Sequence, residues 1–126
     1  MFIQSAKPRK QRRFRFNAPL HVRQKFVHAH IAKDLAKKLG IKKRSVAVRE
    51  GDTVKIMAGK QKGKSGKVSA VDLVSGRIYV EGIARKTMKG KEKLIPISSS
   101  NVYLVELEIS DKLRQEKLNQ FKIVVK

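Results

Sequence analysis

Apolar and polar residues alternate over the second half of the chain, with the period of two that a half-buried β-strand shows. The alternation recurs in five short runs: Val54/Ile56, Val68/Ala70, Ile78/Val80, Ile95/Ile97 and Val102/Leu104. Turn signals rich in glycine or polar residues separate most of these runs, at 59–63, 74–77 and 89–91. Several short strands joined by tight turns are typical of a closed sheet, so we predict a small antiparallel barrel over residues 46–109.

The segment before the barrel, residues 19–45, changes to helical spacing. Pro19 suits the first position of a helix, with Asn17 as its upstream cap, and Gly40 is a natural C-terminal stop. The apolar residues between them recur at helical intervals: Leu20, Val27, Ile31, Leu35 and Leu39. This pattern allows one helix or two helices broken near residues 28–30. Residues 45–48 then predict a short strand that leads into the barrel.

The last part of the chain, residues 110–126, again favours a helix. Ser110 is the expected cap, and Leu113, Leu118 and Phe121 form the expected apolar face. Residues 123–125 are apolar and are expected to pack on the barrel or on a neighbouring protein.

The first 18 residues form a basic arm with no helical apolar stripe. We expect this arm to be extended and disordered in the free protein, since like charges repel and little apolar surface is available. In an extended backbone Phe14 and Phe16 would point to the side opposite Arg13 and Arg15. Two roles for the phenylalanines remain open at this point. They stack on RNA bases, or they hold the arm against its own domain.

Composition indicates a polyanionic partner. The 126 residues contain 31 Lys and Arg against 10 Asp and Glu, a formal net charge of +21. Residues 1–49 hold 15 of the basic residues and a single acid, Asp34, so two thirds of the net charge lies in the first two fifths of the chain. A chain of this length predicts one compact domain with an extension. Nucleic acid is the first candidate partner for such a charge, and an anionic membrane surface is the second.

Several other classes are disfavoured by the sequence. No run approaches the roughly 18 apolar residues of a transmembrane helix, and the N-terminus lacks the apolar core of a secretory signal. The chain has no cysteine, which excludes disulfides and thiolate metal sites. His21, His28 and His30 lie close in sequence without an acidic residue among them, so they favour contact with RNA or solvent over metal binding. The acids are scattered, so we expect no enzyme activity, metal or cofactor.

Residues 58–67 combine glycines with lysines in a single loop. Glycines permit positive φ and close backbone approach, and the expected structural glycines here are Gly51, Gly59, Gly63 and Gly66. The loop differs from the G-x-x-x-x-G-K-[ST] phosphate loop, and no helix pattern follows it. Residues 50–68, from EGDTVKI to GKV, resemble a KOW motif, which implies an SH3-like barrel. Ribosomal proteins and transcription elongation factors share this motif.

The flanks of the motif carry a more specific resemblance. PRKQRRFRFNAPLHVRQKF before it and SNVYLVEL after it are similar to the archaeal and eukaryotic type of KOW-domain protein of the large ribosomal subunit, numbered twenty-fourth in universal naming. The resemblance covers residues 7–111. It implies binding to the 5′ region of large-subunit rRNA, a role in early assembly and a position near the peptide exit tunnel of the cytoplasmic ribosome. The long charged C-terminal extension of eukaryotic members is missing, which favours the archaeal type.

The resemblance and the charge pattern together give the expected RNA-binding residues. The resemblance assigns RNA contact to the arm, to the loop and to the 85–93 hairpin: Lys7, Arg9, Lys10, Arg12, Arg13, Phe14, Arg15, Phe16, Lys60, Lys62, Lys64, Lys67, Arg85, Lys86, Lys89 and Lys91. The basic segment between arm and barrel adds His21, Arg23, Lys25, Lys42, Lys43 and Arg44. Expected partners are large-subunit rRNA, neighbouring ribosomal proteins and factors associated with the exit tunnel. No homo-oligomer is expected.

Two alternatives are weighed against this interpretation. A transcription-associated KOW protein would bind polymerase through a larger apolar surface and a separate upstream domain, and neither is visible in the sequence. A basic DNA-compacting protein would accept any duplex. In the preferred interpretation the barrel docks as a rigid body, and the arm becomes ordered on RNA.

Overall fold

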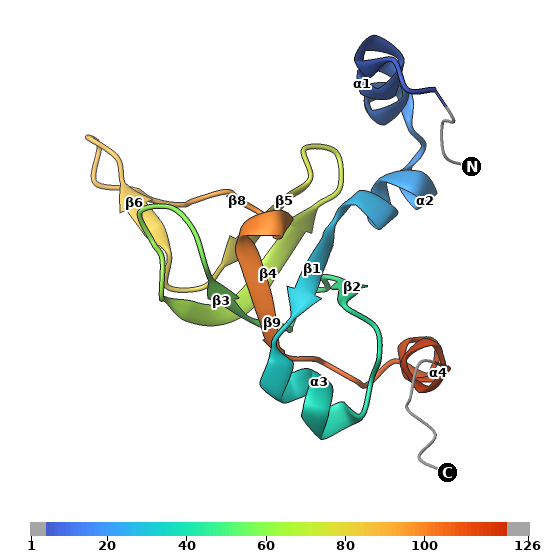
Figure 1. Cartoon of the computed structure of the whole chain (residues 1–126). Coiled ribbons are helices and arrows are strands. Elements are labelled where there is room, and N and C mark those ends of the chain that lie inside the picture. The colour runs from blue at the N-terminus through green and yellow to red at the C-terminus, as the bar shows by residue number, and fades with distance from the viewer. Residues whose placement is uncertain (1–4, 121–126) are drawn as a thin grey trace.

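The computed structural model of the protein describes residues 5–120, which form a mostly β-structure with flanking helices (Figure 1). Its elements follow in chain order: α1 (Pro8–Asn17), α2 (Leu20–Arg23), the 3-10 turn η1 (Gln24–Phe26), β1 (His28–Ile31), α3 (Lys33–Leu39), β2 (Ser45–Ala47), β3 (Thr53–Ile56), β4 (Ser65–Asp72), β5 (Arg77–Val80), β6 (Ala84–Lys86), β7 (Glu92–Leu94), β8 (Ile97–Ser98), the 3-10 turn η2 (Ser99–Asn101), β9 (Val102–Glu106) and α4 (Lys112–Asn119). The predicted fold class, a mostly β-structure with a small barrel, is confirmed.

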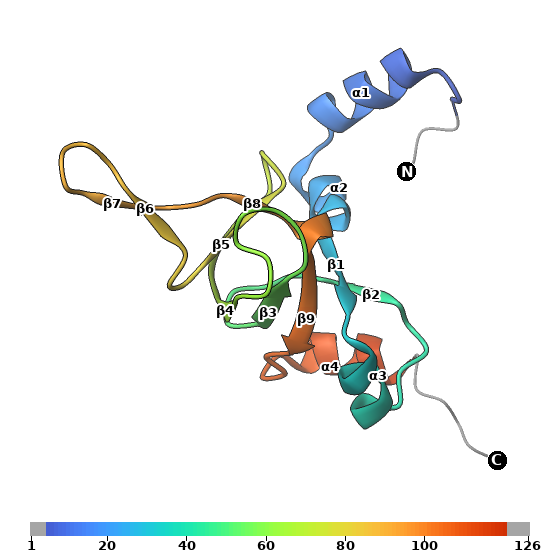
Figure 2. The same ribbon diagram turned by 60° about the vertical axis from the view of Figure 1, so that its left-hand side comes forward.

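The barrel forms where the apolar alternation predicted it. Strands β3, β4, β5, β8 and β9 pair with their neighbours in antiparallel fashion and enclose the core (Figure 2). The inward residues of the alternating runs are almost fully buried: Val54, Ile56, Val68, Ile78, Val80, Val102 and Leu104. β4 pairs first with β3 and then with β5, and its register shifts between Val68 and Ala70. This irregularity bends β4 so that one strand serves both halves of the barrel.

Gly66 has a packing role rather than a conformational one. A Cβ atom at this position would lie 2.7 Å from Cγ1 of Val80 and 2.8 Å from the carbonyl oxygen of Glu81. Any side chain would therefore push β4 away from β5. Gly51, Gly59 and Gly63 have φ values of 91°, 90° and 89°, a region that favours glycine. Each of the four glycines thus meets a requirement of the backbone or of its packing.

The segment expected to be helical, residues 19–45, contains a strand in the middle. β1 pairs antiparallel with β2 and parallel with β9, which extends the barrel into a mixed seven-stranded sheet of order β2-β1-β9-β3-β4-β5-β8. The spacing of Val27 and Ile31 fits a helix, but Val27, Ala29 and Ile31 are all buried in alternation. The break near residues 28–30 is thus a β-strand, which corrects the expectation that the segment 19–45 is helical throughout. The predicted strand near residues 45–48 is confirmed as β2, and Gly40 ends α3 with φ 61°.

Residues 8–17 of the arm form a helix, which corrects the expectation of an extended backbone for that part of the arm. α1 contains Asn17 as its last residue, so Asn17 does not cap the next helix. Pro8, rather than Pro19, occupies the first position of a helix, and Pro19 is the residue that precedes α2. No residue of α1 is buried, and the helix extends away from the barrel (Figures 1 and 2).

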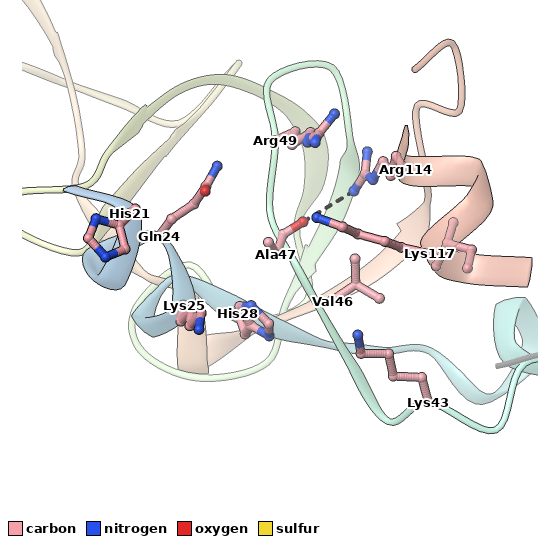
Figure 3. A pocket seen from close by; sticks show the side chains of 11 residues that line it. His21, Gln24, Lys25, His28, Lys43, Val46, Ala47, Arg49, Arg114 and Lys117 are labelled. Carbon is pink, nitrogen blue, oxygen red and sulfur yellow. Dashed lines mark hydrogen bonds between the residues drawn. The ribbon is translucent and has the colours of Figure 1, made fainter. Parts of the chain in front are cut away.

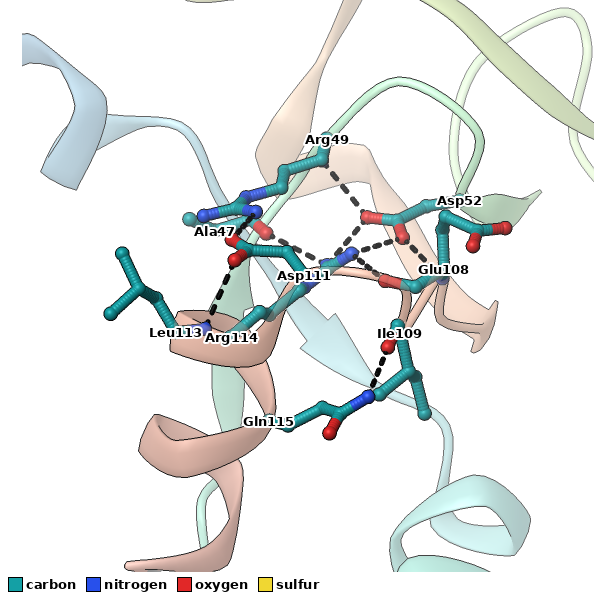
Figure 4. Close-up of polar contacts among 9 residues, drawn as sticks. All are labelled: Ala47, Arg49, Asp52, Glu108, Ile109, Asp111, Leu113, Arg114 and Gln115. Carbon is teal, nitrogen blue, oxygen red and sulfur yellow. Dashed lines mark hydrogen bonds and ion pairs between the residues drawn. The ribbon is translucent and has the colours of Figure 1, made fainter.

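A buried ion pair fixes α4 to the barrel (Figure 4). Two nitrogens of the Arg114 guanidinium donate to the two carboxylate oxygens of Asp52, both at 2.7 Å, and Asp52 is fully buried. Asp52 also accepts hydrogen bonds from the backbone N–H groups of Arg49 and Glu108, each at 2.9 Å. Arg114 donates further to the carbonyl oxygens of Glu108 and Ala47. The carboxylate of Asp52, in the KOW motif, therefore has all its hydrogen-bond partners, which come from the C-terminal part of the chain and from its own turn.

The remaining features of α4 differ in part from the prediction. Asp111, not Ser110, caps the helix, since its side chain accepts from the backbone N–H of Leu113. Leu118 is buried as predicted, whereas Leu113 is 64% exposed. Phe121 and residues 123–125 lie outside the described residues. In the described part of the chain, no helix is long and apolar enough to cross a membrane.

Candidate nucleic-acid interface

A basic groove lies where the loop between β3 and β4 faces the β6–β7 hairpin. Its volume is about 660 Å³. Lys60 lines it from the loop, Arg77 from β5, and Arg85 and Lys93 from the hairpin. Apolar residues complete the wall next to these cations: Ile56, Ala58, Leu94, Ile95, Pro96 and Ile97. No acidic side chain is among the described residues that line the groove, so it offers both positive charge and an apolar surface.

The loop of residues 57–64 presents its lysines outward. Its backbone closes on itself, because Gly63 N–H donates to the Ile56 carbonyl at 2.8 Å and Lys62 N–H donates to the Gly59 carbonyl at 3.1 Å. Lys60, Lys62 and Lys64 are all exposed. The tight turn therefore places three ammonium groups on one exposed loop, and Lys67 is exposed at the start of β4 nearby.

The β6–β7 hairpin extends from the barrel as a separate basic finger (Figure 2). Every residue from 84 to 94 is exposed, including Arg85, Lys86, Lys89 and Lys91. Its tip is ordered by Thr87, whose N–H and hydroxyl both donate to the carbonyl of Lys91 at 2.9 Å. A hairpin without buried side chains gains little stability from its own packing. Its side chains are therefore all available for contact with a partner.

The two phenylalanines of the arm have different surroundings. Phe14 makes an edge-to-face contact with Phe26, with ring centroids 6.4 Å apart, and the guanidinium of Arg15 lies 5.4 Å from the centroid of the Phe26 ring. Phe16 is 80% exposed. Phe14 and Arg15 thus hold α1 against η1, whereas Phe16 offers a free aromatic face. The remaining cations of the arm are exposed: Lys7, Arg9, Lys10, Arg12 and Arg13.

Arg23 is engaged by the protein itself. Its guanidinium donates to the carbonyl oxygens of Phe16 at 2.6 Å, Ala18 at 2.7 Å and Val74 at 3.1 Å. These bonds join the α1–α2 connection to the turn between β4 and β5. Arg23 was expected to bind RNA because of its charge. In the structure its guanidinium instead stabilises the fold through these hydrogen bonds.

Lys42 and Arg44 are exposed between α3 and β2, and neither lines the groove. They belong to the connection that leads into the barrel.

His21, Lys25 and Lys43 come together at a second hollow, between η1, β2 and α4 (Figure 3). His28 lines it too, and burial lowers the pKa of its imidazole below the usual 6.5, with a further lowering by the charge of Lys43. His30 lies elsewhere, in edge-to-face contact with Tyr103. The three histidines therefore do not form one cluster.

Two acidic residues, Asp72 and Asp111, are used in structural bonds. Asp72 accepts from Ser75 and Val74 in the β4–β5 turn, and these hydrogen bonds lower the pKa of its carboxyl group. Asp111 pairs with Arg49, which likewise lowers the pKa of Asp111. Because these carboxylates are engaged, they compete little with an anionic partner for the cations.

Comparison with known proteins identifies the family. A model of the family described as the ribosomal proteins L26 of eukaryotes and L24 of archaea matches residues 5–120. The chain belongs to this family. Two relatives carry the name large ribosomal subunit protein uL24. The one from Pyrobaculum islandicum is 46% identical over 121 residues, 96% of this chain and 97% of the relative. The one from Methanosarcina barkeri is 47% identical over 116 residues, 92% and 98% of the two chains.

Membership of this family makes the chain a structural protein of the large ribosomal subunit. The resemblance stated from the arm and the KOW flanks is confirmed. Sequence reasoning missed Arg77 as a groove residue, because it placed Arg77 in the predicted turn at 74–77. Lys93 lies at the end of the 85–93 hairpin to which RNA contact was assigned, but it was not named among the expected RNA-binding residues.

Proposed function

We propose that this protein binds the 5′ region of large-subunit rRNA and holds it during early assembly of the subunit. In the cytoplasmic ribosome it lies near the peptide exit tunnel, beside neighbouring ribosomal proteins and within reach of tunnel-associated factors. Three surfaces contact the RNA: the exposed face of α1, the groove between the 57–64 loop and the hairpin, and the hairpin tip.

One observation supports this proposal most strongly. Cations from three separate parts of the chain, Lys60, Arg77 and Arg85, line a single groove that has no acidic residue in its described wall. Folding like charges together is unfavourable unless a polyanion compensates them. Residues remote in sequence therefore converge on a surface suited to a phosphate backbone.

Recognition then depends on shape rather than on base edges. The A-form major groove is too deep and narrow for side chains to read, so exposed lysines on a rigid loop would follow the backbone. Phe16 adds one stacking surface for an unpaired base. The barrel docks without rearrangement, while α1, which contacts the rest of the protein through Phe14 and Arg15, is fixed along its length by contact with RNA.

Salt dependence tests the electrostatic part of the proposal. If about 8 phosphates are neutralised, log K should fall with log salt with a slope of about −5 to −7. The affinity for a folded rRNA fragment of the 5′ region, measured by filter binding over a range of KCl, gives this slope. A slope near zero would contradict the proposal.

Specificity is tested by competition and by matched variants. Unlabelled 5′-region rRNA should displace labelled 5′-region rRNA from the protein far better than random duplex DNA does. Equal competition by the two nucleic acids would overturn the ribosomal assignment. The triple variant Lys60→Gln/Arg85→Gln/Lys93→Gln removes three groove cations, whereas Lys33→Gln/Lys37→Gln/Lys38→Gln removes three exposed cations of α3. The groove variant should lose more affinity than the α3 variant of equal charge.

A further inference from the structure

Strand β9 is apolar on both of its faces. Val102 and Leu104 point into the core and are fully buried, whereas Tyr103 and Val105 point outward and are 39% and 37% exposed. The neighbouring strand β3 places the exposed Lys55 opposite Tyr103 instead. A continuous apolar run is typical of a strand that is covered on both sides, since a half-solvated strand alternates apolar and polar residues. The outer face of β9 is therefore suited to a partner.

A hollow of about 610 Å³ lies over this outer face, between α3, β3 and β9. Met57, which directly follows β3 and is 39% exposed, lines this outer hollow together with Tyr103 and Val105. α3 forms one side, because Ala32 N–H donates to the Leu104 carbonyl at 2.8 Å and so places the start of the helix beside the end of β9 (Figures 1 and 2). The hollow has room for several side chains of a partner.

Tyr103 is held firmly at this surface. Its ring makes an edge-to-face contact with the ring of His30, with centroids 5.9 Å apart. Its backbone lies between β1 and β3, where it pairs with His30 on one side and Lys55 on the other. A tyrosine loses little conformational freedom on binding when neighbours already fix it, and tyrosines are frequent among the residues that dominate protein interfaces. Tyr103 is thus a suitable anchor for a partner.

The charges of the outer hollow differ from those of the basic groove. Asp34 and Glu106 both line the hollow, and Asp34 is the single acid among the first 49 residues. Carboxylates repel phosphates, so this face is poorly suited to RNA. The wall also carries three lysines: Lys33, Lys38 and Lys55. A surface with charges of both signs is complementary to a protein segment, which can present both signs, rather than to a polyanion.

We propose that the outer hollow binds a short apolar segment of a neighbouring protein of the large subunit, with charged side chains of both signs at its edges. An apolar side chain of that segment packs on Tyr103 and Val105. A basic side chain pairs with Glu106, and an acidic one pairs with Lys55. The proposal rests on the neighbouring ribosomal proteins of the function proposed above, and it gives them a surface separate from the RNA-binding groove.

Two methionines provide matched probes of the two surfaces. Met57 lines the outer hollow, and Met88, which is 107% exposed, lies between β6 and β7 at the hairpin tip. Hydroxyl radicals oxidise accessible methionines, and mass spectrometry measures the rate at each. The rates are compared in the free protein, in its complex with the folded 5′-region rRNA fragment, and in native large subunits that contain the protein.

The two methionines should become protected at different stages. The rRNA fragment should protect Met88 but leave Met57 as reactive as in the free protein. In large subunits the rate at Met57 should fall about fivefold or more, because the centre of a protein interface is packed as densely as a protein interior. Protection of Met57 by the rRNA fragment alone, or an unchanged rate at Met57 in large subunits, would overturn the proposal.

Zero-length crosslinking decides whether a protein or a remote part of the rRNA covers the hollow. Carbodiimide joins carboxylates to lysines and so reports contacts between proteins. In native large subunits it should join Asp34, Lys55 or Glu106 to another ribosomal protein. Protection of Met57 without any such crosslink would show that RNA covers the hollow, against the proposal. If the rRNA fragment does not protect Met88 and binds no better than duplex DNA, the proposed function itself fails.

A matched pair of variants tests the apolar contact. Val105→Lys places a charge in the hollow, whereas Val74→Lys places the same charge in the β4–β5 turn, where Val74 is 70% exposed. Both should fold, as circular dichroism shows, and Val105→Lys should bind the rRNA fragment as tightly as Val74→Lys does. Retention of Val105→Lys in salt-washed large subunits should be lower by about threefold or more, because an unpaired charge is costly to bury. Equal retention of the two variants would contradict the proposal, and the wild-type footprint decides it if Val105→Lys does not fold.

Discussion

At the scale of single residues, Asp52 and Arg114 have the largest energetic consequence. Two charges are buried together, with a bidentate geometry and additional hydrogen bonds to the backbone. Such a pair adds little stability compared with apolar residues of similar volume, but loss of one partner leaves an uncompensated charge. The buried Nε of Arg114 finds no hydrogen-bond partner, which adds to the cost of the burial.

We therefore predict that Arg114→Met destabilises the protein by about 3–5 kcal/mol, because Asp52 keeps its charge without a cation. Urea unfolding followed by circular dichroism measures this loss. The exposed pair offers a control, since Arg49→Met removes the partner of Asp111 at the surface and should have a much smaller effect. The double variant Asp52→Asn/Arg114→Met should be less destabilised than the sum of the two single variants. An additive result would contradict the coupling.

His28 gives a pH dependence of stability with a defined sign. Its pKa is lowered in the folded protein, so the folded state resists protonation. Well above pH 6.5 the imidazole is neutral in both states, and as pH falls through that value the unfolded chain takes up the proton first. Stability is therefore lost on acidification from pH 7.5 towards pH 5. His28→Gln should show a shallower loss over this range in urea unfolding, and an unchanged slope would contradict the role of His28.

At the scale of elements, α1 is the part whose conformation depends most on context. Ten residues without a buried side chain form a helix despite repulsion among arginines at neighbouring turns. Isolated helices of this length are marginal in water. Phe14 and Arg15 contact Phe26, and these contacts stabilise the C-terminal turn of α1.

The two phenylalanines of α1 should respond differently to substitution. Phe16→Ala removes an exposed ring, so it should weaken rRNA binding about fivefold or more without changing the unfolding midpoint. Phe14→Ala removes the contact with Phe26 and should reduce the helical signal of the arm with a smaller effect on affinity. Binding assays and circular dichroism distinguish the two. Equal losses of affinity would contradict a special role for Phe16.

Local patterns predicted the elements that local interactions determine. The alternating runs, the turns and Gly66 were accessible because period and residue type decide them. Strand β1 could not be predicted in this way, because it pairs with β9, and this pairing joins His30 to Tyr103, which lies far along the chain. The helix of the arm was missed because charge argued against it. Asp52 and Arg114 are 62 residues apart, and nothing local marks either as half of a pair.

At the scale of the whole molecule, the charged extensions point in different directions. α1 and the β6–β7 hairpin leave the barrel on different sides (Figures 1 and 2). Residues 1–49 hold two thirds of the net charge. One rigid body with separate basic extensions can contact several RNA segments at once. The affinity should then come from joint engagement rather than from any single surface.

Removal of residues 1–17 tests this division of labour. The variant should retain the cooperative unfolding of the barrel, since α1 buries no residue of its own. Its rRNA affinity should fall, and its log–log salt slope should become shallower by about 0.7–0.9 for each phosphate that the arm neutralises. Loss of the folded state would show that α1 is part of the barrel's stability, against this prediction.

The Asp52–Arg114 pair also has a consequence for synthesis on the ribosome. Asp52, which directly precedes β3, emerges long before Arg114, which follows 62 residues later. Until that arginine emerges, closing the barrel would bury a carboxylate without its cation. Vectorial folding is therefore held back at the last step, and a nascent chain interrupted before residue 114 lacks the charge needed to complete its core.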